Sequence, residues 1–164
     1  MSGLEHEIVE LLPRLRRLAR ALTPDMADAD DLVQLTMERA WVRHDQWRAG
    51  TRLDSWMFRI MKNAWIDETR ARRRRFAVLA PAEQGEHVGD DGEGAMQMRL
   101  AVGEVERAMA RLPEDQRIAV ALVLVEGLSY KDAAEVLEIP PGTLTSRLAR
   151  GRTALMAQLQ EVAP

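Results

Sequence analysis

A chain of 164 residues is long enough for one ordinary domain or two small ones, and this one has a net charge of −3, with 46 % hydrophobic and 30 % charged residues. That balance is typical of a soluble globular protein, no apolar run is long enough to span a membrane, and the acidic N-terminus is unlike a signal peptide. The absence of cysteine excludes disulfides and thiolate metal sites and favours a cytoplasmic protein. The histidines are scattered and no catalytic motif occurs, so we expect no metal, no cofactor and no enzyme activity.

The first half of the chain reads as helices separated by short breaks. A leucine pattern predicts a helix over residues 4–22, with a late start or a kink at Pro13. The acidic segment DADDL begins a second helix, because carboxylates are favourable at a helix N-terminus. The segment HDQWRAGTR (residues 44–52) predicts a loop, and a third helix follows from Leu53 to Arg75.

Residues 79–95 have the composition of a flexible linker, with four glycines, one proline and only acidic charge. Helical patterns resume beyond it, over residues 96–111, 114–126, 130–137 and 141–161. We therefore predict an all-α protein of two small helical domains and an acidic joint, with boundaries at 1–78, 79–95 and 96–164.

The segment GLSYKDAAEVLEIPPGTLTSRLARGRTAL (residues 127–155) predicts a helix-turn-helix. Ser129 can cap the short first helix, and Pro141 fits the first turn of the second. Leucines at positions 144, 148 and 155 can pack inward. The remaining polar positions of the second helix are then exposed or partly so: Thr143, Thr145, Ser146, Arg147, Arg150 and Arg152.

This polar face predicts DNA binding. No acidic residue occurs between Glu138 and Glu161, as expected for a helix that lies against phosphates. Arginine pairs bidentately with guanine in the major groove at about 1–3 kcal/mol of discrimination per good contact. Each arginine taken singly also fits a solvated helix face, so the prediction rests on the combined pattern.

Two blocks of the sequence resemble bacterial RNA polymerase sigma factors of the extracytoplasmic-function (ECF) type. The C-terminal block resembles their region 4 at Leu112-Pro113, at LSY (residues 128–130), at Ala133-Ala134 and at GTLTSRLARGR (residues 142–152). The N-terminal block resembles their region 2 at ADDLVQLT (residues 29–36), at SWMFRIMKNAWID (residues 55–67) and at the arginine run that follows. The resemblance implies a transcription initiation factor that binds core RNA polymerase and promoter DNA.

The resemblance assigns roles to individual positions. The DDLVQ helix implies docking on the clamp helices of the β′ subunit, and the C-terminal domain implies contact with the β flap. The polymerase-binding residues implied are Asp31, Val33, Gln34, Thr36 and Arg39. An ordinary amphipathic helix with N-terminal acids would show the same pattern.

The minus-ten promoter element is implied to contact the loop before the third helix and that helix itself. Single-stranded bases stack on aromatic side chains. We expect Trp41 and Trp56 in the core, which leaves Trp47 as the stacking candidate. Asp67 is expected to pair with Arg70 or a nearby arginine. The minus-ten set is Trp47, Arg48, Asn63, Arg70, Arg73 and Arg74, and the minus-thirty-five set is the helix-turn-helix face with Lys131 added.

Arg70 and Arg72 to Arg75 form a run with no acid inside it, and we expect these arginines to repel one another unless an anion is bound. Four phosphate contacts would give a salt slope of about −3.6, or roughly a 150-fold change in affinity between 50 and 200 mM salt.

Four positions depart from the family pattern. Leu35 stands where an acid is common and Met37 where an aromatic is common. Thr145 replaces a common lysine. Glu138 replaces the usual glycine of the turn, which predicts a turn without a positive φ.

Three other functions are considered beside the sigma factor. One is an ordinary helix-turn-helix regulator, which would not need the N-terminal block. The second is a sigma-like mimic that binds an anti-sigma protein and never contacts promoters, and the third is an enzyme. The resemblance also implies an anti-sigma factor as a partner, and the acidic linker could cover the basic faces of the free protein.

Overall fold

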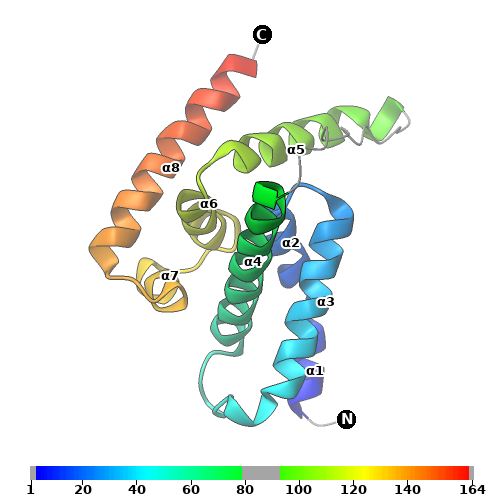
Figure 1. Ribbon diagram of the computed structural model, residues 1–164, viewed down its shortest axis with the longest axis vertical. Coiled ribbons are helices and arrows are strands. Elements are labelled where there is room, and N and C mark those ends of the chain that lie inside the picture. The colour runs from blue at the N-terminus through cyan, green and yellow to red at the C-terminus, as the bar shows by residue number, and fades with distance from the viewer. Residues whose placement is uncertain (1–2, 79–92, 163–164) are drawn as a thin grey trace.

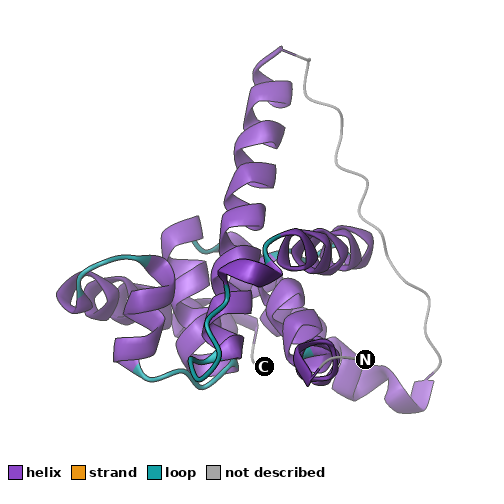
Figure 2. Ribbon diagram, turned by 90° about the horizontal axis from the view of Figure 1, so that it is seen from below, coloured by secondary structure: helices purple, strands orange, loops and turns teal. Residues whose placement is uncertain are grey.

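The computed structural model describes the backbone of residues 3–78 and 93–162, and every regular element in these ranges is helical (Figures 1 and 2). The predicted all-α fold is therefore confirmed. None of the described helices combines the length and apolarity that a membrane crossing requires.

The N-terminal unit contains α1 (Gly3–Glu10), α2 (Leu12–Leu22), α3 (Met26–Val42) and α4 (Leu53–Val78), with a short 3₁₀ turn over His44–Gln46. The break between α1 and α2 falls at Leu11, two residues before Pro13, because a proline lacks the amide that would continue the first helix and fits the first turn of the second. Asp25 caps α3, since its carboxylate accepts a hydrogen bond from the Asp28 amide at 3.0 Å.

The leucines of α2 face the middle of this unit. Leu15, Leu18 and Leu22 are fully buried and share a core with Met57 and Phe58 of α4. Their 3- and 4-residue spacing places them on one face of the helix, as the sequence predicts.

The C-terminal unit contains α5 (Glu93–Arg111), α6 (Glu114–Val120), the π-helical segment η2 (Ala121–Val125), α7 (Tyr130–Leu137) and α8 (Pro141–Val162). The helix predicted over residues 114–126 is thus α-helical only in its first half. It ends in a wider turn, in which the Glu126 amide donates to the Ala121 carbonyl at 3.0 Å. The predicted linker is helical from Glu93 onward, and its other residues lie outside the described ranges.

The turn between α7 and α8 corrects one prediction. Glu138 has a φ of +56° and is the only non-glycine residue with a positive φ in the described ranges. The reason is the closure of α7: the Ile139 amide donates back to the Ala134 carbonyl at 3.1 Å, which requires a left-handed residue between them. At the other end of α7, the Ser129 hydroxyl accepts from the Asp132 amide at 3.1 Å, so the predicted cap is confirmed.

The two units are packed together, with α4 between the other helices of both units (Figure 1). Helix α2 contacts α5, α6 and η2, and α4 contacts α7. The buried apolar side chains of both units form one continuous core. The sequence predicts two domains and a joint, but it does not predict this closed arrangement.

Candidate nucleic-acid and protein interfaces

Helix α8 presents the polar face that the helix-turn-helix pattern predicts. Leu144 and Leu148 are buried, and this turns Ser146 and Arg150 toward solvent. The hydroxyls of Thr145 and Ser146 donate to backbone carbonyls one turn earlier, at 3.0 and 3.1 Å. The face is therefore exposed without leaving these hydroxyl donors unsatisfied.

The structure brings four of the predicted minus-thirty-five residues together around one polar depression. Thr143, Ser146, Arg147 and Arg150 line it, together with Gly142 and Asp115. Asp115, from the first turn of α6, lies 3.6 Å from Arg147 and restrains its guanidinium. The other three predicted residues, Lys131, Thr145 and Arg152, are exposed but do not line the depression.

The arginine run at the end of α4 has acidic partners elsewhere in the chain. Arg72 pairs with Asp28 at 2.6 Å, and Arg73 pairs with Glu114 of α6. The hydrogen bond to Asp28 raises the pKa of Arg72. Arg70 and Arg74 are exposed. The expected mutual repulsion is thus partly offset without a bound anion, because the folding brings in carboxylates that are distant in sequence.

The exposure of two tryptophans, Trp41 and Trp47, is the reverse of what the sequence predicts. Trp41 is 52 % exposed, although the sequence predicts it in the core. It follows the buried Ala40 and lies about 100° round the helix from it. Trp47 is partly buried against the core, and its indole N–H is buried without an acceptor among the described residues. Trp56 is partly buried on the core, as expected.

The remaining minus-ten candidates lie apart from one another. Arg48 is exposed in the loop before α4, and Asn63 is partly buried in the middle of that helix. About eleven residues, or roughly 16 Å of helix, separate Asn63 from Arg74. The candidates thus follow α4 and its preceding loop rather than gathering at one point.

The predicted docking helix, α3, presents only part of the predicted set. Asp31 and Gln34 are exposed, and Arg39 is partly exposed and donates to Asp67 at 3.1 Å. Val33 and Thr36 instead lie in the core, and the Thr36 hydroxyl donates to the Leu32 carbonyl at 2.7 Å. In this structure these two side chains cannot reach a partner, because they lie on the stripe of α3 that packs inward. Asp67, expected to pair with Arg70 or a nearby arginine, pairs with Arg39.

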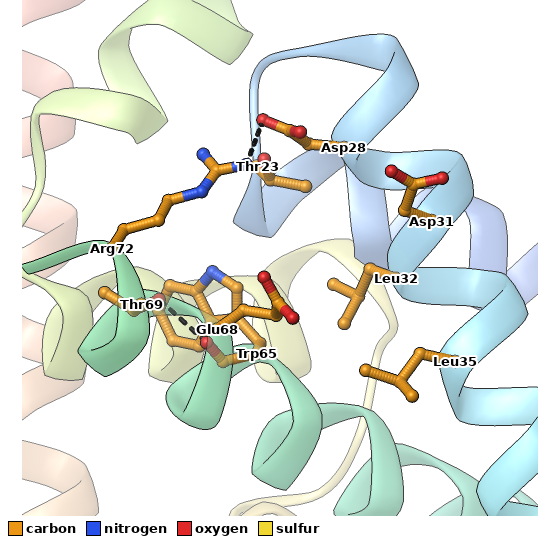
Figure 3. A pocket seen from close by; sticks show the side chains of 9 residues that line it. All are labelled: Thr23, Asp28, Asp31, Leu32, Leu35, Trp65, Glu68, Thr69 and Arg72. Atoms are coloured by element: carbon orange, nitrogen blue, oxygen red, sulfur yellow. Dashed lines mark hydrogen bonds and ion pairs between the residues drawn. The ribbon is translucent and has the colours of Figure 1, made fainter. Parts of the chain in front are cut away.

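A small pocket of about 150 Å³ opens between α3 and α4 (Figure 3). Leu32, Leu35 and Trp65 give it an apolar side. Acidic groups lie around it, and the ion pair between Arg72 and Asp28 crosses one edge. Its other residues are Thr23, Asp31, Glu68 and Thr69. A pocket with this lining suits a partner side chain that combines an apolar stem with a positive end.

Sequence reasoning missed the polar residues between the two units. Glu126 is fully buried at its side chain and accepts from Arg17 Nε at 2.6 Å and from Arg14 Nε at 3.3 Å. Arg117 lies over the ring of Trp65 and donates to the Leu22 carbonyl at 2.9 Å. For Glu126 the available signal was an acidic residue directly after the apolar run IAVALVLV (residues 118–125), whereas the arginines stand among other polar residues and gave no such signal.

Comparisons with known proteins agree with the two blocks. Residues 103–155 match the family model described as Sigma-70, region 4, and residues 8–62 match the one described as Sigma2 domain of PhyR. The chain is 35 % identical to the ECF RNA polymerase sigma factor EcfG of Rhodopseudomonas palustris, over 96 % of this chain and 86 % of the relative. It is 38 % identical to the ECF RNA polymerase sigma factor SigM of Mycobacterium tuberculosis, over 87 % of this chain and 69 % of the relative.

Two solved structures have the same fold. The sigma factor RpoE from Bartonella quintana, solved in complex with the anti-sigma factor NepR, aligns with a TM-score of 0.81 at 30 % identity, covering 99 % of this chain and 100 % of that one. The PhyRSL–NepR complex from Sphingomonas sp. Fr1 aligns with a TM-score of 0.68 at 22 % identity, covering 99 % and 93 %. This second likeness shows the fold alone.

Proposed function

The chain belongs to the ECF RNA polymerase sigma factors, and from that premise we propose how its surfaces divide the work of transcription initiation. The N-terminal unit, residues 1–78, binds core polymerase and the minus-ten element. The C-terminal unit, residues 96–164, binds the minus-thirty-five element, and residues 79–95 join them. The observation that carries the proposal is an exposed arginine face on the helix-turn-helix of a chain whose other unit presents a separate acidic docking surface.

Polymerase docking is assigned to the outer face of α3 and the pocket beside it. Asp31 belongs to both, since it is exposed on α3 and lines the pocket. Gln34 and Arg39 extend the surface along the helix. A basic and apolar surface of the β′ clamp helices would complement it, and the β flap is proposed for the C-terminal unit.

Promoter binding is assigned to α8 and to the track along α4. Arg147 and Arg150 are placed to reach base edges or phosphates at the minus-thirty-five element. Arg70, Arg74 and Arg48 supply positive charge along the minus-ten track. The exposed Trp41 joins Trp47 as a candidate for base stacking, because its indole is accessible.

Regulation by an anti-sigma factor completes the proposal. RpoE of Bartonella quintana, which is similar to this chain over nearly its whole length, was solved with such a factor bound. We place the protein in the cytoplasm, where bacterial polymerase acts.

The test is in vitro transcription with purified core polymerase on a pool of promoter fragments from the host. The expected result is specific initiation that depends on this protein. Arg150→Gln should lower initiation from those promoters about 5- to 150-fold, which corresponds to about 1–3 kcal/mol for one good base contact. Arg16→Gln, on the exposed side of α2, is the matched control and should behave like the unaltered protein.

A sigma-like mimic is the second candidate. Residues 8–62 match the Sigma2 domain of PhyR, and PhyRSL forms a complex with NepR, the protein named as an anti-sigma factor in the RpoE structure. A chain that binds an anti-sigma factor but neither core polymerase nor promoter DNA would support the mimic and overturn the initiation factor.

A further inference from the structure

Helix α6 places one carboxylate on the polar face of α8. Asp115, in the first turn of α6, lines the polar depression together with Arg147 and Arg150. Its Oδ2 atom lies 3.6 Å from Arg147 Nε, which is within ion-pair distance but beyond hydrogen-bond length. The sequence of α8 contains no acid before Glu161, so the tertiary structure brings a carboxylate to a face whose own helix supplies none.

The position of Asp115 follows from the close packing of α6 against α8. Gly151 lies one turn after Arg147, on the same side of α8, and a Cβ atom built there would meet the Gln116 carbonyl oxygen at 3.3 Å. The Gln116 amide in turn donates to Asp115 Oδ1 at 2.9 Å. One oxygen of the carboxylate is therefore held by the backbone of α6, and the other lies beside Arg147.

Stability gives only a small reason for a carboxylate at this position. An acid is favourable in the first turn of α6, but Glu114 already supplies one. The side chains of Asp115 and Arg147 are 49 % and 31 % exposed, and an ion pair so open to solvent contributes little to stability. Beside a DNA duplex, the negative charge would repel phosphates and lower the affinity for every sequence.

The ion pair leaves Arg147 able to bind a base. Asp115 approaches the Nε side of the guanidinium, and the two terminal nitrogens have no acceptor among the described residues. Guanine O6 and N7 accept two parallel hydrogen bonds from such a planar pair of donors. A guanidinium that is already oriented loses less side-chain entropy on binding than a free one. Arg150 lies in the same depression without an ion-pair partner in the described structure.

We propose that Asp115 is a positioning residue for promoter recognition, which orients Arg147 toward a guanine of the minus-thirty-five element. The inference rests on the proposed minus-thirty-five role of α8 and adds a residue that determines specificity there. Asp115 acts through Arg147 and does not contact DNA itself. Its charge lowers the affinity for all sequences while its restraint favours one, and specificity is the difference between those two affinities.

The first test uses holoenzyme assembled from core polymerase and the full chain, on a promoter that the transcription test has identified. The minus-thirty-five element is randomised, and a barcode in the transcribed region reports which templates are used. Arg147→Gln should abolish the preference for guanine at one base pair. Asp115→Asn should reduce the preference at that same base pair about fivefold or more, the lower end of what one bidentate contact contributes.

Two further variants separate positioning from other roles. Asp115→Glu keeps the charge and should restore the preference in part, and Asp115→Asn should have no further effect in an Arg147→Gln background. Glu161→Gln removes a charge at an exposed position of α8 and should leave every preference unchanged. A preference lost at a different base pair in Asp115→Asn would mean that Asp115 contacts DNA itself. That result, or an unchanged preference, would overturn the proposal.

A second measurement uses the free protein and needs neither DNA nor polymerase. Nitrogen-15 relaxation of the Arg147 Nε–H group reports the picosecond-to-nanosecond motion of the guanidinium. Asp115→Asn should lower the order parameter at Arg147 and leave that at Arg150 unchanged. Equal order parameters at Arg147 in the two proteins would overturn the restraint on which the proposal depends.

These measurements distinguish failure of the inference from failure of the proposed function. A chain in which Asp115 restrains Arg147 but which initiates at no promoter would overturn the initiation factor. An active holoenzyme whose base preferences do not depend on Asp115 would overturn the positioning role alone.

Discussion

Gly151 is a residue at which α8 packs closely against α6. A Cβ atom built there would lie 2.8 Å from Val120 Cγ2 and 3.3 Å from the Gln116 carbonyl oxygen. The first distance is shorter than packed carbon atoms adopt, and the second involves backbone that cannot turn aside. The close approach of the two helices therefore depends on the missing side chain.

We expect Gly151→Ala to lower the free energy of unfolding by about 1–3 kcal/mol, because an added methyl group must push α8 away from α6. Urea denaturation followed by circular dichroism measures it. Gly103→Ala is the matched control: its nearest neighbours are atoms of the flexible Arg107 side chain, at 3.6 Å or more. That substitution should stabilise the helix by up to about 1 kcal/mol. Equal effects at both positions would contradict the packing argument.

The contribution of Asp54 to the free energy of unfolding should depend on pH, and the direction of its pKa shift gives the sign. Burial favours its neutral form, but hydrogen bonds from Arg52, Arg14 and the Ser55 amide outweigh burial and lower the pKa of Asp54. A carboxyl group whose pKa is lower in the folded state stabilises the fold above its unfolded pKa, and this contribution is lost as the pH falls through the folded pKa.

Asp54→Asn should therefore cost about 1–3 kcal/mol near neutral pH, and the cost should shrink steadily below about pH 4. Chemical denaturation of both proteins across this range gives the difference. Asp45→Asn, at an exposed position in the 3₁₀ turn, should show no such trend. A cost that is constant with pH would show that the charge of Asp54 is not what stabilises the fold.

At the scale of elements, periodicity predicts the helices well and their fine structure poorly. The spacing of Leu15, Leu18 and Leu22 is a local property, so it identifies α2 without tertiary information. The π-helical end of α6 and the positive φ of Glu138 are different, since each depends on how the next segment closes onto the helix. The predictions for Trp41 and Trp47 were wrong for a related reason. The sequence shows that α3 has an apolar face, but it does not show where the helices that cover this face end.

Helix α4 contains a buried lysine, Lys62, whose burial does not stabilise the fold. Lys62 is buried, which lowers its pKa and makes the charged form unfavourable in the folded state. A base with a lowered pKa costs stability at pH values below its folded pKa, and the cost decreases as the pH rises through that value.

Lys62→Met should raise the free energy of unfolding at neutral pH by about 1–2 kcal/mol and show a smaller gain at alkaline pH. Denaturation at both pH values measures this gain in stability, with the exposed Lys131→Met as control. A loss of stability at neutral pH would mean that the closed protein depends on this lysine.

At the scale of the whole molecule, the closed arrangement is the feature that the sequence predicted least. Linker composition and two separate hydrophobic patterns predict two units, whereas the buried apolar side chains of the described helices form one continuous core. The contacts between them join residues far apart in the chain, such as Arg17 and Glu126, which are separated by 109 positions. Such pairs have no local periodicity, so the charge pattern alone could not assign partners to Glu126, to Arg73 or to Lys62.

Glu126 is a buried acidic residue at the contact between the two units. Its carboxylate is fully buried and binds two arginines of α2, whose side chains are themselves 31 % and 53 % exposed. Loss of the charge would leave both arginines able to reach water, but it would leave a polar amide buried between the units. The free energy should therefore be lost from the contact between the units rather than from either unit alone.

Glu126→Gln should weaken that contact by about 1–3 kcal/mol, as expected for hydrogen bonds to charged groups. Small-angle X-ray scattering should show a larger radius of gyration, and thermal unfolding should broaden or divide into two steps, because the continuous core no longer couples the units. Glu161→Gln removes the same charge at an exposed position of α8 and should leave both measurements unchanged. If Glu126→Gln lowered the unfolding temperature in a single sharp step with an unchanged radius, Glu126 would stabilise its own unit and not the closed arrangement.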